Sequence, residues 1–379
     1  MAQITLKAVS KIYSRKNGTD LVAVGDLNLE ISDHEFVVLT GPAGCGKSSV
    51  VRMIAGLEEI SKGEIFIGDR RINDLPPKDR DIAWVPQSYM PYPLMSVHDN
   101  LAFGLKRRKF SEAEIKKRLK AAAEILGLEE LLERKPNELS SEQRQRMAVA
   151  RAVALQPKAF LFDEPLASLD PDARVRMRNE IAKLHQRLQV TTIYATHDPV
   201  EAMALGDRIV VMSNGTVQQA GTAPVLYREP ANAFVARFLG DPPMNLVEGT
   251  LKQDRDSFLF SENGEGTIAV RLPSSEFPGA RDFVGEPVLL GIRPEDIQVA
   301  HSPKAPEKYS GAFPAIVDLV EPLGSDTLIY LQTGAHTLIC RSQRGADGHE
   351  FGHRSQFQIE LEQAHLFDFA STRRIGPGA

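Results

Sequence analysis

Apolar residues in the first part of the chain follow two different periods. Short, unbroken apolar runs are typical of strands buried on both faces of a sheet, and they occur at residues 35–40, 159–163, 191–196 and 208–212. Between these runs, apolar residues recur at helical spacing, at residues 47–55, 111–126, 141–155 and 172–188. Because strands alternate with helices, we expect residues 1–236 to form an α/β domain with a mostly parallel sheet.

The pattern changes after residue 236. The stretch RFLGDPPMNLVEG, residues 237–249, contains the Gly and Pro residues that are typical of a joint between domains. Helical spacing nearly disappears beyond it. Short β runs separated by Gly, Pro and Asp follow, among them TIAVRL, PVLLGI, TLIYLQ and QFQIEL. We therefore expect residues 237–379 to form an all-β domain built from small barrels of the oligonucleotide/oligosaccharide-binding (OB) type.

Composition and charge narrow the possible functions. The formal net charge is −5, so the chain has no overall positive field that would attract nucleic acid or anionic lipid. Cys45 and Cys340, its two cysteines, lie far apart, which favours a reducing cytoplasm over a disulfide framework. No run approaches about 20 consecutive apolar residues, the length that spans a bilayer. We expect a cytoplasmic protein that has no nucleic-acid partner and reaches a membrane only through another subunit.

The stretch GPAGCGKSS follows one predicted strand and begins the next predicted helix. It matches the phosphate-binding pattern G-x-x-x-x-G-K-[ST] in the required strand–loop–helix context. In such a loop the backbone N–H groups surround a polyphosphate, the lysine reaches the β and γ oxygens, and the following hydroxyl binds Mg²⁺. The residues predicted to contact the nucleotide are Gly41, Pro42, Ala43, Gly44, Cys45, Gly46, Lys47, Ser48 and Ser49, and Ser48 is also a predicted Mg²⁺ ligand.

Two acids end another predicted strand, AFLFDEP. Asp163 is placed to hold the Mg²⁺ shell that a phosphate-loop enzyme requires. Glu164, one residue further along, points elsewhere and can polarise a water molecule as a general base.

Three further candidates have a weaker basis. Gln87 follows a β run and can reach Mg²⁺ or the attacking water, and His197 ends a strand, where a neutral imidazole can bond a γ-phosphate. Tyr13 lies in a strand-like segment and can stack on adenine. Taken alone, each of the three is more often structural, and only the loop and the acid pair give them a functional meaning.

The stretch ELSSEQRQRMAVARAVA contains a helix start. Ser140 and Gln143 have the S-x-x-Q spacing of a capping box. A helix N-terminus is also a ready anion site, so the same feature predicts either a capped helix alone or a phosphate site.

These motifs, in this order, resemble the ATP-binding subunits of ABC transporters. The resemblance rests on Tyr13, GPAGCGKSS, Gln87, LSSEQ, LFDEP, SLD and His197. It is strongest to the carbohydrate-importer branch, typified by the maltose importer, whose regulatory domain of small β barrels is similar to the tail with GIRPEDI and AHLF. The implied fold is an ABC-type P-loop NTPase domain with a helical subdomain at about residues 88–155, followed by an OB-like regulatory domain.

The resemblance assigns roles to matching positions. The loop and Asp163 would be the Walker A and Walker B motifs that bind ATP and Mg²⁺, and Glu164 would be the catalytic base. Gln87 would be the Q-loop glutamine and His197 the switch histidine. Tyr13 would be the aromatic residue that stacks on the adenine.

The resemblance also implies partners. Two ATP-binding subunits would enclose ATP head to tail, so that Ser140, Gln143 and the helix N-terminus face the γ-phosphate of the other subunit. The capping box and the phosphate site would then use the same backbone N–H groups. Transmembrane permease subunits would dock at SYMPYPLMSV, and an extracytoplasmic solute-binding protein would act indirectly. The expected role is ATP hydrolysis that energises import of a sugar or related carbohydrate.

One departure from the family pattern concerns the signature L-S-G-G-Q, which here is L-S-S-E-Q. Glycines allow the closest approach to a phosphate, whereas Ser141 and Glu142 carry side chains. A carboxylate about 4 Å from a phosphate charge would cost about 4 kcal/mol at an effective dielectric constant near 20. Either Glu142 turns away and a homodimer works, or the chain works best beside a different subunit. Two other functions remain open, a regulatory ATP-binding subunit with weak turnover and a soluble ATPase acting on nucleic acid.

Overall fold

The computed structural model describes the chain except for residues 1–2, 15–17, 89, 301–311, 344–350 and 377–379. The chain divides into two compact units, Met1–Ala223 and Pro224–Ala379. Within the described residues no helix is long and apolar enough to cross a bilayer.

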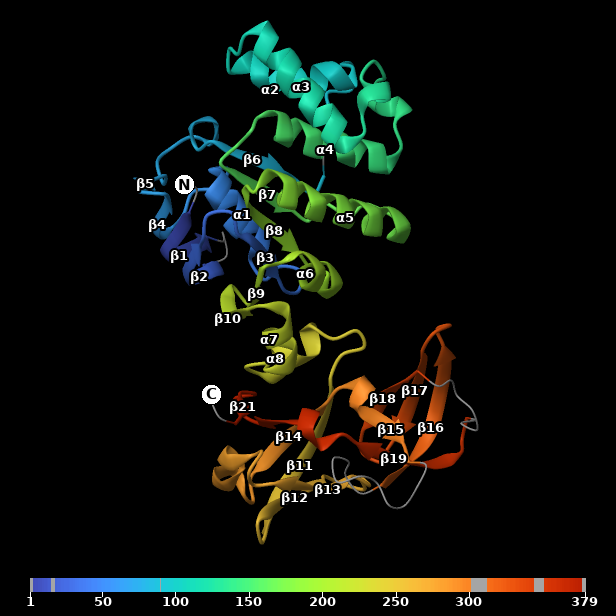
Figure 1. Cartoon of the computed structure of the whole chain (residues 1–379). Coiled ribbons are helices and arrows are strands. Elements are labelled where there is room, and N and C mark those ends of the chain that lie inside the picture. Colours follow the sequence, from blue (N-terminus) through green and yellow to red (C-terminus); the bar gives the residue numbers. More distant parts are fainter. Residues whose placement is uncertain (1–2, 15–17, 89, 301–311, 344–350, 377–379) are drawn as a thin grey trace. The chain divides into compact units, whose positions relative to one another are not determined.

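A six-stranded sheet forms the centre of the first unit, in the order β10-β9-β3-β8-β7-β6 (Figure 1). Five strands are parallel, and β10 pairs antiparallel with β9. The strands are β3 (Phe36–Thr40), β6 (Ile82–Val85), β7 (Ala159–Asp163), β8 (Thr191–Thr196), β9 (Arg208–Ser213) and β10 (Thr216–Gly221). Every residue of β3, β7 and β8 is buried, which confirms the interpretation of the unbroken apolar runs.

Three helices follow the parallel strands. They are α1 (Lys47–Ala55), α5 (Pro171–Leu188) and α6 (Pro199–Leu205). A second, antiparallel sheet shares a core with α1 and the central strands, and its order is β2-β1-β4-β5. Its strands are β1 (Ile4–Tyr13), β2 (Leu21–Ile31), β4 (Lys62–Ile67) and β5 (Arg70–Arg71). The predicted α/β architecture is confirmed.

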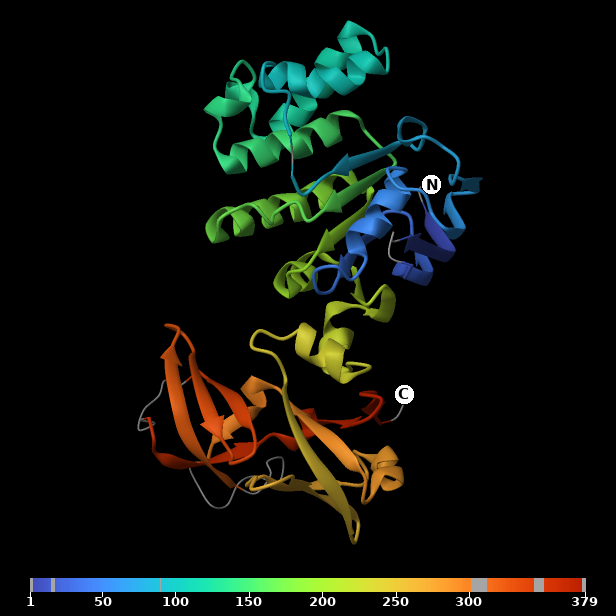
Figure 2. The same ribbon diagram turned by 180° about the vertical axis from the view of Figure 1, so that it is seen from behind.

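A helical subdomain occupies part of the segment expected to contain it. Its helices are α2 (Val97–Arg107), α3 (Glu112–Leu126) and α4 (Ser141–Ala154), with 3₁₀ turns at Glu129–Leu131 and Pro136–Glu138; a further 3₁₀ turn lies at Pro77–Asp79. The side chains of Ser96, Ser111 and Ser140 each accept a backbone N–H at a helix start, as N-caps do. In both views α2 and α3 (cyan) lie on the far side of α4 (green) from the central sheet, and α4 itself contacts β6 (Figures 1 and 2).

The second unit begins with α7 (Ala223–Arg228) and α8 (Ala233–Phe238) and continues as two antiparallel sheets. One has the order β13-β12-β11-β14-β20-β21 and the other β15-β19-β16-β17-β18. The strands are β11 (Asn245–Asp254), β12 (Ser257–Glu262), β13 (Ala269–Pro273), β14 (Pro287–Ile292), β15 (Ile297–Val299), β16 (Phe313–Pro322), β17 (Thr327–Gln332), β18 (Thr337–Ser342), β19 (Arg354–Ile359), β20 (His365–Asp368) and β21 (Arg374–Ile375). Short 3₁₀ turns lie at Pro278–Phe283, Pro294–Asp296 and Leu361–Gln363.

One apolar core joins these two sheets, so the described part of the tail is all-β as expected. The tail also contains a buried carboxylate that is hydrogen-bonded on both oxygens. The carboxylate of Glu262, at the end of β12, accepts a hydrogen bond from the Thr333 hydroxyl and lies 2.6 Å from Nδ1 of His336. Its other oxygen accepts the N–H of Ile268 at 3.0 Å. A buried carboxylate with partners on both oxygens stabilises one arrangement of the sheets, because any other arrangement leaves it unpaired.

The boundary between the units lies earlier than the expected position after residue 236. The reason is that α7 and α8 are tied to the tail. The buried guanidinium of Arg293 donates to the carbonyls of Tyr227 and Ala236 at 2.7 and 2.8 Å, and Ala236 packs with Phe367. In sequence, α8 looks like one more helix of the α/β domain. In the structure its apolar face packs against Met244 and Phe367 of the tail.

Truncation tests this boundary. A chain ending at Ala223 is expected to fold and bind ATP, because the first unit keeps its own core. A chain ending at Phe238 keeps the whole of α8 without the surface that buries it, and we expect it to aggregate more readily. Gel filtration and circular dichroism of both chains measure this. Better behaviour of the longer truncation would place the boundary after α8.

Candidate active site

The predicted site residues follow strands that end at the same edge of the central sheet. Thr40 at the end of β3 pairs with Thr196 at the end of β8, and Asp163 at the end of β7 pairs with Ala195. The strands are parallel, so the segments that leave them begin at the same level. The phosphate-binding loop, the acid pair and His197 are therefore neighbours, although they lie far apart in the sequence.

Two glycines of the loop are required by its geometry. Gly41 and Gly46 have φ angles of 148° and 108°, a region that L side chains rarely adopt. A Cβ atom would lie 2.1 Å from the Met212 carbonyl oxygen at Gly41, and 2.4 Å from the Ala23 carbonyl oxygen at Gly46. The loop leads directly into α1, whose first N–H groups have no side-chain cap. Such a loop leaves backbone donors to an anion.

Lys47 lies across the loop. Its side chain is 3% exposed, and the ammonium donates to the carbonyls of Gly41 and Pro42 at 2.9 and 3.0 Å. The same nitrogen lies 3.8 Å from Oε1 of Glu164. A buried lysine with this small set of weak acceptors is placed to exchange them for the oxygens of a polyphosphate.

Asp163 and Glu164 point their carboxylates to different partners. Asp163 is 1% exposed and accepts a 2.6 Å hydrogen bond from the Ser48 hydroxyl. Glu164 has a left-handed φ of 47°, which turns the chain directly after the strand. Its Oε2 accepts a 3.3 Å hydrogen bond from the Gln87 amide and lies 3.1 Å from Nδ1 of His197. The structure thus brings Gln87, Glu164 and His197 together, as the sequence predicts.

The donor set suits magnesium. The hydroxyl of Ser48 and the carboxylate of Asp163 are adjacent hard oxygen ligands, and Mg²⁺ is held by one or two carboxylates together with substrate phosphates. No group of three or more His, Cys, Asp or Glu residues in the described chain is placed to hold a metal ion. A magnesium ion here would therefore depend on the phosphates for its remaining ligands. The Gln87 amide nitrogen is directed at Glu164 and not at these two oxygens.

A buried acid holds the segment that carries His197. Glu201 on α6 accepts hydrogen bonds from the hydroxyls of Tyr194 and Thr196 at 2.9 and 2.8 Å. Burial raises the pKa of this carboxyl. Asp198 caps α6 by accepting the N–H of Val200 at 2.7 Å. The turn at His197 is thus fixed on both sides. Glu201 was not predicted from the sequence, because one acid near a helix start usually serves only the helix dipole.

Tyr13 lies beside Ser49, the last residue of the GPAGCGKSS stretch. Its hydroxyl lies 3.3 Å from Oγ of Ser49 and donates to Glu58. The pKa of Tyr13 is raised by burial and by the Glu58 carboxylate. Arg52 lies 3.6 Å from Glu58 and 3.5 Å from Asp163, so one hydrogen bond and two ion pairs connect Tyr13 to Asp163. Arg52 on α1 and Glu58, three residues after the end of that helix, belong to no motif and were not predicted, since charges at such positions usually face solvent.

Ser140 and Gln143 lie on the helical subdomain and form the predicted capping box. Gln143 donates its backbone N–H to the Ser140 hydroxyl at 3.2 Å, and Ser140 donates its own to the Gln143 side chain at 2.9 Å. Within the described residues, no hydrogen bond or ion pair links either of them to the loop or the acid pair. Since the box uses these two N–H groups, the donors left at the helix start belong to Ser141 and Glu142. The capping box and a phosphate site would not share their N–H groups, contrary to the sequence interpretation.

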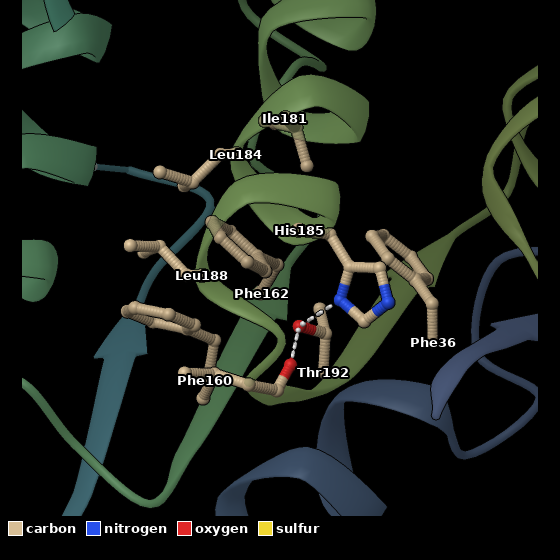
Figure 3. Close-up of a pocket in the computed structure, with 9 residues that line it drawn as sticks. Phe36, Phe160, Phe162, Ile181, Leu184, His185, Leu188 and Thr192 are labelled. Carbon is tan, nitrogen blue, oxygen red and sulfur yellow. Dashed lines mark hydrogen bonds between the residues drawn. The ribbon is translucent and has the colours of Figure 1, made fainter. Parts of the chain in front are cut away.

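A small cavity lies elsewhere in the same unit (Figure 3). It measures about 10 Å³, at most the room of one water molecule. Phe36, Phe160 and Thr192, which line it together with His185 of α5, lie at or near the amino ends of their strands. Burial lowers the pKa of His185, and its ring meets that of Phe36 edge-on at 5.1 Å. This cavity is part of the packing under α5 and lies at the opposite sheet edge from the loop.

Comparison with known proteins decides the family. Residues 24–167 match the family described as ABC transporter, 240–297 the MalK OB fold domain and 290–367 the TOBE domain. The chain is 44% identical to the trehalose/maltose import ATP-binding protein MalK of Thermococcus litoralis, over 99% of this chain and 100% of that protein. The chain belongs to the ABC transporter family. It is also 45% identical to the oligosaccharides import ATP-binding protein MsmX of Bacillus subtilis, with the same coverage.

Solved structures agree with this membership. A dimeric ATP-binding cassette in a post-hydrolysis state with ADP and phosphate has a TM-score of 0.53 and 31% sequence identity, and covers 58% of this chain and 98% of its own. The resemblance inferred from sequence, the ABC-type fold and the OB-like tail are thereby confirmed. As an ABC ATPase the chain binds and hydrolyses ATP.

Two substitutions separate binding from turnover in this ABC ATPase. Lys47→Ala removes charge-assisted hydrogen bonds of about 1.5–3 kcal/mol to the phosphates, and we expect ATP affinity to fall roughly 10- to 100-fold. Glu164→Gln keeps the shape of the site but removes the base, and we expect turnover to fall at least about 100-fold while binding stays.

Titration calorimetry with ATP and a phosphate-release assay measure these effects. Glu59→Gln is the matched control, since Glu59 is an exposed acid just after α1. Unchanged hydrolysis by Glu164→Gln would remove the general base from its assigned role.

Proposed function

We propose that this chain is the ATP-hydrolysing subunit of an ABC importer for a sugar or related carbohydrate. The observation that carries the proposal is the match along the whole length. The relatives named as import ATP-binding proteins, which include the multiple sugar-binding transport protein MsmK of Streptococcus mutans at 46% identity, align with the β tail as well as with the ATPase unit. An ABC domain alone would leave the solute class open, but the MalK-type tail supports a carbohydrate.

The site geometry supports a division of labour in hydrolysis. Lys47 exchanges the loop carbonyls for β- and γ-phosphate oxygens, and the backbone of the loop surrounds the phosphates. Ser48 and Asp163 would hold Mg²⁺, which neutralises charge on the phosphates when it is bound. Glu164 takes a proton from the attacking water. Gln87 and His197 hold the carboxylate at the place where that water arrives, and Tyr13 stacks on the adenine.

The proposed importer role implies partner proteins. A second ATP-binding subunit would complete each site head to tail, with the amino end of its α4 at the γ-phosphate. This agrees with the observation that, among the described residues, no hydrogen bond or ion pair links Ser140 or Gln143 to the loop of the same chain, and a similar cassette is solved as a dimer. Permease subunits would hold the chain at the cytoplasmic face of the membrane, and an extracytoplasmic protein would deliver the solute. Met90 and Leu94, whose side chains are 82% and 88% exposed close after Gln87, offer an apolar docking surface.

Two other functions have less support. A regulatory ATP-binding subunit with weak turnover was suggested by the LSSEQ signature alone, and the importer relatives do not favour it. A soluble ATPase that acts on nucleic acid has no positive surface field in its favour, given a net charge of −5.

Co-purification from the native membrane tests the proposal. We expect the tagged chain to bring down two or more apolar permease subunits, and Met90→Ser with Leu94→Ser to reduce their yield roughly tenfold while ATP binding is unchanged, since two buried apolar side chains are lost from the interface. Leu323→Ser, which alters a 61% exposed leucine in the tail, is the matched control. Transport in vesicles should stop with Glu164→Gln. Recovery of only cytoplasmic partners would contradict the importer assignment.

A further inference from the structure

Glu142, the residue that breaks the signature pattern, is fully paired. It is the second residue of α4. Its Oε1 accepts a 2.9 Å hydrogen bond from Arg146, one turn along the same helix. Its Oε2 accepts two hydrogen bonds from Arg176 of α5, from Nη2 at 2.8 Å and from Nε at 3.1 Å. Both oxygens are thus occupied by guanidinium groups, and the side chain is only 19% exposed.

Two arginines oppose the charge of this carboxylate. Arg146 also pairs with Glu180 of α5, so two acids and two arginines form one cluster between the helices. The hydrogen bond from Arg176 is the main reason that the pKa of Glu142 is lowered, and the same bond raises the pKa of Arg176. The Glu142 carboxylate is therefore ionised, but its charge is compensated beside the helix start.

Arg176 is the member of the cluster that sets the direction of the side chain. Arg146 lies on the same helix as Glu142 and is shared with Glu180, so it would follow the carboxylate in several orientations. Arg176 comes from a different helix and donates through two nitrogens, a fork that fixes geometry as well as charge. It draws the carboxylate sideways to α5, while the N–H groups of Ser141 and Glu142, which have no hydrogen-bond partner in the described chain, point along the helix axis.

We propose that Arg176 is a positioning residue that holds the Glu142 carboxylate against α5 and so keeps the amino end of α4 open to the phosphate of a nucleotide bound by a second subunit. The inference rests on the proposed head-to-tail dimer. It resolves the conflict between an acid in the signature and a phosphate site. A free Glu142 would repel the incoming phosphate and compete for the same N–H groups. Held by Arg176, it leaves two donors and a compensated charge.

A structural role for Arg176 is the competing explanation, because exposed ion pairs contribute little to function or stability in most proteins. A pairwise design separates the two roles. The variants are Arg176→Met, Glu142→Gln and the two together, in the full-length chain with its permease subunits. Glu142→Gln removes the charge at its source and sets the reference for the pair. Arg187→Met, an exposed arginine in the last turn of α5, is the matched control.

We expect Arg176→Met to lower kcat roughly tenfold or more, since a carboxylate paired only with Arg146, which Glu180 shares, could then turn to within a few ångströms of the phosphate. Adding Glu142→Gln should restore kcat to within about threefold of Glu142→Gln alone, because no charge remains to be held. Raised salt should reduce the defect of Arg176→Met through screening. Arg187→Met should match the parent.

A second readout does not depend on hydrolysis. In the Glu164→Gln background, the amount of radiolabelled ATP retained after rapid gel filtration reports closure of the dimer over nucleotide. Arg176→Met should reduce retention, and Glu142→Gln should recover it. Equal losses with and without Glu142→Gln, or no loss at all, would overturn the positioning role. If the parent neither turns over nor retains ATP, the proposed function fails and the inference fails with it, a result distinct from loss of the rescue alone.

Discussion

The parallel register of three strands determines where the site-forming segments of the ATPase unit leave the sheet. Because β3, β8 and β7 end level with one another, the loop, the His197 turn and the acid pair leave the sheet at one height. A shift of one strand by a single residue would reverse the faces on which its side chains lie and move its loop along the edge. The buried residues on both faces of these strands prevent such a shift. The apolar core thus sets the positions of charged groups that never enter it.

Three acids of the proposed phosphate sites each lie beside a positively charged or ionisable basic side chain. Asp163 lies near Arg52, Glu164 near Lys47 and His197, and Glu142 near Arg146 and Arg176. In the proposed dimer each of these acids would lie at a place that also receives a highly negative ligand. A neighbouring cation reduces the repulsion that the ligand meets, and some of these cations can transfer to the phosphate. The site is therefore balanced through exchangeable ion pairs, whose strength depends on partial burial.

The sequence predicted those parts of the site that follow from local spacing. The loop is recognisable because Gly41 and Gly46 meet a backbone requirement that few sequences satisfy, and the acid pair because it ends a buried strand. Arg52, Glu201 and Arg176 were not predicted. Each lies on a helix, and its importance comes from a partner on another element, which neither periodicity nor composition records. The boundary at Ala223 was missed for the same reason, since Arg293 and Phe367, which hold α8, lie far along the chain.

The capping box of α4 allows this helix to form before the subunit assembles with a partner. A helix start leaves four backbone donors without partners, and the side chains of Ser140 and Gln143 supply acceptors for two of them from within the chain. The helix therefore needs neither nucleotide nor a neighbouring subunit in order to begin at the correct residue. A newly synthesised chain can complete its signature helix while it is still alone. In the proposed head-to-tail dimer, the partner's nucleotide would then meet a helix end that is already formed.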